Sequence, residues 1–123
     1  MISKNTVLQI HHSLIEVYGG AKGIRNLSLL ESAINRSFAT FDGVDLYPTA
    51  LHKAAAIFQS ILINHPFLDG NKRTALALLL YVLKSGNNIL TINENEIYEF
   101  VISCSKGEKE FDEILIWLQI HSQ

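Results

Sequence analysis

This sequence is poor in the residues that mark several classes of protein. Cys104 is the only cysteine among 123 residues, so no disulfide can form within the chain, and we expect a protein of the reducing cytoplasm. The chain has 10 lysine and arginine residues against 12 aspartate and glutamate residues, for a net charge of −2. These few basic residues are scattered, whereas binding to nucleic-acid phosphates requires a basic cluster. We therefore expect no direct contact with nucleic acid.

Long hydrophobic runs are also missing. The longest apolar stretch, residues 74–83, is shorter than a bilayer-spanning helix, and residues 1–5 lack the apolar run of a signal peptide. Hydrophobic residues nevertheless make up 48% of the chain and charged residues 18%, which is typical of a compact globular protein. We expect a single domain, residues 1–123, with no membrane contact.

Two prolines and seven glycines divide the chain into segments whose apolar residues recur at helical spacing. Residues 4–18 form the first predicted helix. Asn26 is the expected N-cap of a second helix, which reaches Phe38. Residues 39–48 contain an Asp-Gly pair and a proline, and they predict either a loop or a short hairpin.

The next two predicted helices are the most apolar segments of the chain. Thr49 is the expected N-cap of a helix that is apolar nearly all round and ends before Pro66. Such a helix is usually central and buried. Another apolar helix begins near Asn71 and runs through Leu83, with Gly86 suited to the C′ position.

The remainder of the chain also favours helices. Residues 89–92 predict a short extended piece, and Asn93 with Glu96 resembles a capping box that starts a fifth helix. Gly107 ends that helix, and a last one begins near Phe111. The sequence therefore predicts an all-α fold, a compact bundle around a central buried helix pair.

The unusual feature is the stretch that joins the two buried helices, residues 65–73. Polar and charged side chains are costly beside a core unless they are paired or bind a ligand. The helix that follows directs its free N–H groups and positive dipole end towards this stretch. Gly70 allows close approach of a ligand, Lys72 and Arg73 add positive charge, and Phe67 is expected to anchor the loop. This combination predicts a phosphate-binding site.

Asp69 is an acidic residue at this predicted anion site. A Mg²⁺ ion would explain it, because one carboxylate plus phosphate oxygens is a usual ligand set for that metal. His65 is the candidate general base, since imidazole exchanges protons near neutral pH. Taken singly, His65 and Asp69 could serve as helix-end groups and Arg73 as a surface side chain. Their concentration in one loop between core helices favours phosphate transfer instead.

The sequence around this loop resembles a known family. Residues 64–75, NHPFLDGNKRTA, are similar to the signature of Doc (death-on-curing) toxins within the Fic superfamily, whose pattern is His-x-Phe-x-Asp/Glu-Gly-Asn-Gly-Arg-x-x-Arg. Segments outside the motif are similar too: His11, Tyr18-Gly19-Gly20, residues 23–25, 30–33 and 53–55, and Gly86-Asn87. The resemblance implies a helical Fic/Doc-like bundle with the loop as its active site.

The resemblance also implies a role for each matching residue. His65 would take a proton from the target hydroxyl, and Asp69 would hold the metal ion. Gly70 and Asn71 would form the anion hole, and Arg73 would bind phosphate. The species bound there would be ATP with Mg²⁺.

Two positions depart from the pattern of Fic AMP-transferases, because Lys72 replaces the second glycine and Leu76 the second arginine. Both departures are shared with Doc proteins. Doc proteins are described as kinases that transfer the ATP γ-phosphate to a threonine of the translation factor EF-Tu and so arrest translation. The resemblance thus implies a toxin with protein kinase activity. AMP transfer to a protein hydroxyl and a catalytically silent interaction module are the alternatives.

The same resemblance also implies a partner. The superfamily's inhibitory segment, Ser/Thr-x-x-x-Glu-Gly/Asn, has no counterpart in this sequence. A separate antitoxin similar to Phd is therefore implied, with a segment that folds on an apolar groove.

Outside the motif we predict structural or surface roles for His11 and His12, and an ion pair between Arg25 and Glu31. Residues 42–47 occupy the place of a target-positioning flap, by analogy alone.

Overall fold

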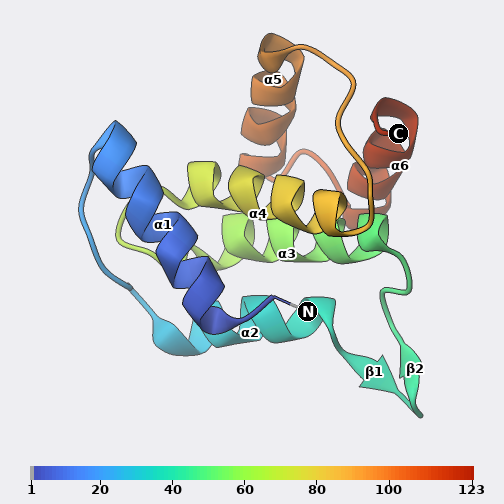
Figure 1. Cartoon of the computed structure of the whole chain (residues 1–123), viewed down its shortest axis with the longest axis horizontal. Coiled ribbons are helices and arrows are strands. Elements are labelled where there is room, and N and C mark those ends of the chain that lie inside the picture. Colours follow the sequence, from blue (N-terminus) through green and yellow to red (C-terminus); the bar gives the residue numbers. More distant parts are fainter. Residues whose placement is uncertain (1) are drawn as a thin grey trace.

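The computed structural model describes residues 2–123. Within that range the chain forms six α-helices and one antiparallel strand pair (Figure 1). The elements, in chain order, are α1 Lys4–Tyr18, α2 Leu27–Ser37, β1 Thr40–Phe41, β2 Val44–Asp45, α3 Ala50–Asn64, α4 Asn71–Ser85, α5 Glu94–Ser105 and α6 Phe111–His121. The predicted all-α class is confirmed. None of the helices in the described range is long and apolar enough to cross a membrane.

The predicted central helix pair is also confirmed. Helices α3 and α4 lie side by side through the middle of the molecule, and the loop of interest joins them (Figure 1). Helix α2 packs against α3 on the side away from α4, while α1 crosses α4. The fully buried side chains of the pair include Phe58, Ile57, Ile61, Leu78, Leu79 and Leu83. The loop is therefore anchored at both ends in the core.

Helix starts follow the sequence closely. The side chains of Asn26, Thr49 and Asn93 each accept a hydrogen bond from a main-chain N–H in the first turn of the next helix. All three are the predicted N-caps, and each such cap stabilises a helix by about 1 kcal/mol. Helix α6 begins with a reciprocal capping box formed by Glu110 and Glu113.

The end of α4 differs from the prediction. Gly86 has a φ of −99°, and the left-handed residue is Asn87, with a φ of 63°. Gly86 serves close packing instead, because a Cβ atom there would lie 2.4 Å from the Cβ of Ala50 at the start of α3. A glycine that the sequence suggests for a helix end is thus required by contact between two helices.

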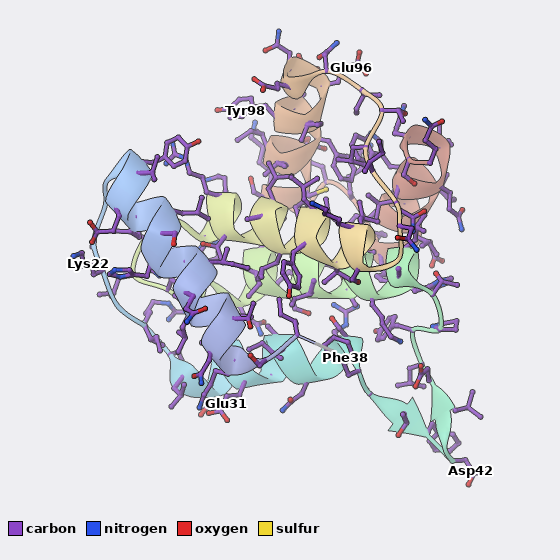
Figure 2. The ribbon with its side chains drawn as sticks, in the orientation of Figure 1. Lys22, Glu31, Phe38, Asp42, Glu96 and Tyr98 are labelled. Atoms are coloured by element: carbon purple, nitrogen blue, oxygen red, sulfur yellow. The ribbon has the colours of Figure 1, made fainter. Side chains whose placement is uncertain are left out.

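Residues 39–48 form the hairpin that was one of the two predicted alternatives. Thr40 pairs with Asp45 and Phe41 with Val44. The turn between them has positive φ at Asp42 and Gly43, as a type I′ turn requires. The hairpin projects from the body of the molecule, with Asp42 at its tip (Figure 2).

The C-terminal helices are fastened to the core in two ways. Ile89 exchanges both main-chain hydrogen bonds with Gln123, so the predicted extended piece at 89–92 pairs with the end of the chain. Phe100 of α5 stacks on Trp117 of α6 at 3.7 Å between ring centroids. Cys104 of α5 is also buried, and burial raises the pKa of its thiol to about 12, which fits a structural residue.

Candidate phosphate-binding site

The loop between α3 and α4 begins and ends with residues in the left-handed backbone region. His65, the C-cap of α3, has φ 46° and ψ 56°. Gly70, the N-cap of α4, has φ 75°. A left-handed conformation costs a non-glycine residue about 1 kcal/mol. The position of His65 must therefore be held by the contacts around it.

The segment that leads into α2 provides those contacts. The main-chain N–H groups of Arg25 and Asn26 both donate to the carbonyl oxygen of Pro66, at 2.7 and 3.1 Å. The N–H of Leu68 donates in turn to the carbonyl oxygen of Gly23 at 3.1 Å. The loop and this segment thus form a short antiparallel pairing that joins residues about 40 positions apart in the sequence.

Arg25 also holds the end of α3 with its side chain. Its guanidinium donates from Nε to the carbonyl oxygen of His65 at 2.6 Å and from Nη2 to that of Asn64 at 2.7 Å. A cation that binds the last carbonyl groups of a helix is favourable with respect to the helix dipole. The predicted ion pair between Arg25 and Glu31 is wrong, because the guanidinium binds carbonyl oxygens of α3 instead.

The side chain of Asn71 is used inside the loop. Its Oδ1 accepts from the N–H of Phe67 at 3.1 Å, and its Nδ2 donates to the carbonyl oxygen of Phe67 at 3.0 Å. Both residues are buried, and Phe67 lies in the core as predicted. The amide of Asn71 is therefore occupied, so its contribution to an anion site would come from the main-chain N–H.

The first turn of α4 presents free N–H groups. Within residues 2–123, the main-chain N–H groups of Asn71, Lys72 and Arg73 make no hydrogen bond. The side chains of Lys72 and Arg73 are exposed beside them. Unpaired N–H groups at a helix start, together with two cations, form a site suited to phosphate.

Asp69 lies next to this turn with its carboxylate exposed. Its Oδ2 accepts from the N–H of Ala21 at 3.2 Å, and its Oδ1 accepts from the N–H of Gly70 at 2.8 Å. These two main-chain hydrogen bonds, that of Ala21 first, hold the pKa of Asp69 below its ordinary value. The carboxylate is therefore charged at neutral pH, and each of its oxygens keeps a lone pair for a further ligand.

A metal ion at this carboxylate would need further ligands from a bound phosphate compound and from water. Among residues 2–123, no group of three or more His, Cys, Asp or Glu side chains could hold a metal by itself. Mg²⁺ is commonly bound by one or two carboxylates together with substrate phosphates and water. The single exposed carboxylate of Asp69, beside the free N–H groups of α4, would fit such a ligand set.

All six predicted site residues line one groove. It has a volume of about 1140 Å³. The predicted residues on its wall are His65, Asp69, Gly70, Asn71, Lys72 and Arg73. The imidazole of His65 is exposed and makes no hydrogen bond to any described residue, so it is free to accept a proton.

The other walls of the groove were not predicted. Helix α1 contributes Tyr18, whose ring lies 4.5 Å from the guanidinium carbon of Arg73. Helix α5 contributes an opposite wall that includes Ile97 and Tyr98, and Tyr98 projects on the side of α5 that faces the end of α1 (Figure 2). Only the resemblance of Tyr18-Gly19-Gly20 to the Doc pattern pointed to one of these walls. Beyond the cationic end, the groove lining is mostly apolar, with Glu94 and Asn95 also on the α5 wall.

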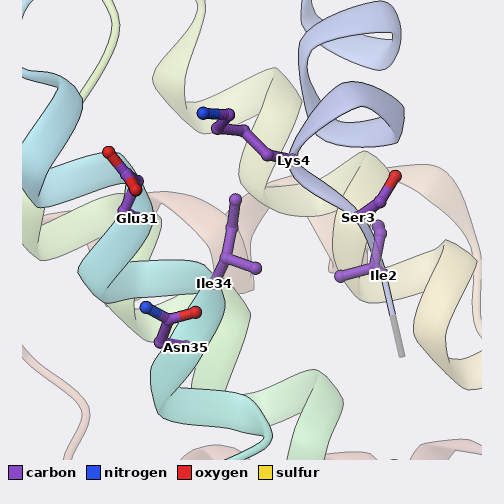
Figure 3. Close-up of a pocket in the computed structure, with 6 residues that line it drawn as sticks. All are labelled: Ile2, Ser3, Lys4, Glu31, Ile34 and Asn35. Atoms are coloured by element: carbon purple, nitrogen blue, oxygen red, sulfur yellow. The ribbon is translucent and has the colours of Figure 1, made fainter.

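A second, smaller pocket lies elsewhere and contains none of the predicted site residues. It has a volume of about 350 Å³ and is formed by the start of α1 and by α2 (Figure 3). Its lining includes Lys4 and Glu31. Its lining contains no histidine and only one carboxylate, that of Glu31, so it lacks the combination of groups found in the groove.

The hairpin does not adjoin the groove. It is attached at the start of α3, whereas His65 lies at the end of that helix (Figure 1). A helix of 15 residues separates them by about 22 Å at 1.5 Å per residue. The expectation that residues 42–47 position a target at the loop is therefore not supported by this arrangement.

The sequence is similar to those of known proteins. The sequence model described as the Fic/DOC family matches residues 1–83. Over 60 residues the chain is 50% identical to a protein called Toxin Doc from Mycolicibacterium smegmatis. That match covers 49% of this chain and 46% of the relative, so it spans about half the length of the curated protein. Because the family match includes α1 to α3, the loop and most of α4, the chain belongs to the Fic/DOC family.

Proposed function

We propose that this protein is the toxin of a toxin–antitoxin system and acts as a phosphotransferase, moving the γ-phosphate of ATP to a hydroxyl group of a target protein. Membership of the Fic/DOC family supports a transferase, and the identity to Toxin Doc supports a toxin. The observation that carries the proposal is the groove, where a candidate base, a charged carboxylate and the free N–H groups of α4 face the same space.

The mechanism assigns one task to each group. The imidazole of His65 accepts the proton of the target hydroxyl, whose oxygen bonds to the γ-phosphorus as the bond to the β–γ bridging oxygen breaks. ADP leaves with that oxygen. The N–H groups at the start of α4, with Lys72 and Arg73, bind phosphate oxygens. Asp69 would hold Mg²⁺, which neutralises phosphate charge when bound.

Lys72 and Leu76 favour phosphoryl transfer over AMP transfer. They are four residues apart on α4, hence on one face of the helix, and both line the groove. Where an AMP-transferase has a second phosphate-binding arginine, Leu76 offers only an apolar surface. Where it has a glycine, Lys72 places a bulky cation. Both changes disfavour the nucleotide position that AMP transfer requires.

The proposed target is a threonine of EF-Tu, so that translation stops, and the proposed compartment is the cytoplasm. The proposed inhibitor is a Phd-like antitoxin whose segment folds on binding. Coupled folding of this kind needs an apolar surface. The wall formed by Leu76, Leu80 and Ile97 supplies such a surface beside the proposed catalytic groups.

The decisive experiment incubates the protein with Mg²⁺, ATP and EF-Tu and then measures the intact mass of EF-Tu. We expect a phosphoryl increment that disappears with His65→Ala. A nucleotidyl increment would instead establish AMP transfer. An unchanged mass would show that EF-Tu is not the target. If the protein also consumed no ATP with other hydroxyl-bearing substrates, the result would support a catalytically silent module.

Growth arrest on expression gives a second test with a matched control. His65→Ala should relieve arrest, whereas His12→Ala should not, because His12 lies exposed on α1 and is not among the described residues that line the groove. If the His65→Ala variant accumulated to the same level and stayed toxic, the assignment of the base would be wrong.

A further inference from the structure

One buried histidine near the groove has no role in the mechanism above. His11 of α1 is only 5% exposed, although neighbouring His12 has a side chain that is 62% exposed. We propose that His11 is a positioning residue, which fixes the Asp69–Gly70 peptide and through it the Asp69 carboxylate and the start of α4. This role rests on the proposed function, since it concerns the same phosphate site.

Two contacts place His11 under the loop. Its Nε2 lies 2.9 Å from the main-chain carbonyl oxygen of Asp69. Its ring stacks on the ring of Phe67, with centroids 3.8 Å apart and planes 7° from parallel. Because a carbonyl oxygen can only accept, Nε2 must carry the hydrogen. The contact therefore specifies the Nε2–H tautomer of His11.

This hydrogen bond acts on a peptide that is also bonded on its other side. The carbonyl of Asp69 and the N–H of Gly70 belong to one planar unit. His11 binds the carbonyl, and the N–H donates to Asp69 Oδ1 at 2.8 Å. Rotation of the peptide would break both bonds together. Holding the carbonyl thus also holds the carboxylate and the left-handed N-cap from which α4 starts.

Gly70 allows the loop to come down onto α1. A Cβ atom at this position would lie 3.1 Å from Cδ1 of Ile15 and 3.7 Å from Nε2 of His11. Its φ of 75° also disfavours any side chain. The absence of a side chain at Gly70 thus lets His11 of α1 reach the carbonyl of Asp69 on one side of the loop. It also leaves the groove side open to a phosphate ligand.

A purely structural histidine and a positioning histidine respond differently to substitution. If His11 only fills the core, the effect of a variant should follow its packing. If it positions the loop, the effect should follow the presence of an N–H donor. His11→Phe keeps the ring and its stacking but removes the donor. His11→Gln keeps a donor and removes the ring.

The test measures three quantities for the wild type, His11→Phe, His11→Gln and the control His12→Phe. These are the dissociation constant of Mg²⁺·ATP, the rates of amide hydrogen exchange of Gly70 and Asn71 without nucleotide, and the melting temperature. We expect His11→Phe to weaken ATP binding about tenfold, the effect of one lost hydrogen bond, and to speed exchange in the loop. His11→Gln and His12→Phe should bind within about threefold of the wild type, even where His11→Gln melts at a lower temperature.

The proposal is overturned if His11→Phe binds ATP and exchanges like the control, or if binding follows the melting temperature rather than the donor. A nitrogen NMR spectrum of the wild type gives a check that needs no variant, because the Nδ1–H tautomer of His11 would also overturn the proposal. If the wild type does not bind Mg²⁺·ATP, the proposed function fails. In that case the amide exchange rates of Gly70 and Asn71, together with the tautomer of His11, still test whether His11 holds the loop.

Discussion

Single residues in and around the loop either bond to the main chain or face the groove. The amide of Asn71 and the guanidinium of Arg25 form hydrogen bonds with main-chain atoms of the loop and of the end of α3. The side chains of His65, Lys72 and Arg73 are exposed on the groove. Asp69 belongs to both sets, because its carboxylate accepts two main-chain hydrogen bonds and remains exposed.

That double role makes the stability of the loop depend on pH in the acid range. Hydrogen bonds to the charged form lower its pKa below the ordinary 3.8. Their contribution to loop stability is therefore complete above pH 3.8 and is lost as the pH falls through the lower, folded-state pKa. We expect the amide NMR signals of Ala21 and Gly70 to shift with a midpoint below pH 3.8. A midpoint at or above that value would contradict the hydrogen bonds, and the shift should vanish in Asp69→Asn.

Among the helices, the sequence predicted local features well. Caps such as Asn26 and Thr49 act on the next turn of the same helix, so a short stretch of sequence contains all the information. The position of the free first turn of α4 was predictable for the same reason, because Gly70 and the cations that follow it are neighbours in the chain. The motif of residues 64–75 also indicates a family, which composition alone does not.

Contacts between distant elements could not be read from the same patterns. The bond from Arg25 to the carbonyl oxygen of His65 depends on α2 running back along α3, which brings the entry to α2 beside the end of α3. The need for Gly86 depends on how closely α4 approaches Ala50. The α5 wall of the groove likewise arises from packing rather than from a motif.

The contact of α3 with α4 at Gly86 leads to a prediction of coupled stability. Gly86→Ala should lower the free energy of unfolding by about 1–3 kcal/mol through overpacking against Ala50, although alanine fits the local φ and would otherwise stabilise. Adding Ala50→Gly should recover much of that loss. Urea denaturation of the two single variants and the double variant measures the coupling. Strictly additive effects would mean that the two side chains do not meet.

The cap on α3 provides a second prediction for the helices. Arg25→Leu removes two charge-assisted hydrogen bonds and should cost about 1–2 kcal/mol of stability, with faster amide exchange at Leu68. Arg25→Lys keeps the charge but not the planar fork, so we expect an intermediate loss. Equal effects of the leucine and lysine variants would show that the fork geometry is unimportant.

For the molecule as a whole, the groove depends on the part of the chain beyond the family match. Residues 1–83 contain the loop and the catalytic candidates, but α5 provides the opposite wall. That helix is linked to the core through a row of stacked rings, with Phe58 and Phe100 5.9 Å apart and Phe100 and Trp117 3.7 Å apart. A stable groove therefore requires the C-terminal helices to fold with the rest.

Trp117 offers a direct test of this coupling, because it is the only tryptophan of the chain. If α5 and α6 fold together with the central pair, the urea transitions followed by Trp117 fluorescence and by far-ultraviolet circular dichroism should coincide. Phe100→Ala, which removes the middle ring of the stack, should move both transitions together to lower urea and lower the free energy of unfolding by about 3 kcal/mol. A fluorescence transition that moved alone to lower urea would mean that the C-terminal helices unfold separately. Binding of Mg²⁺·ATP should then weaken over the same urea range, since one wall of the groove would be lost while the loop remained folded.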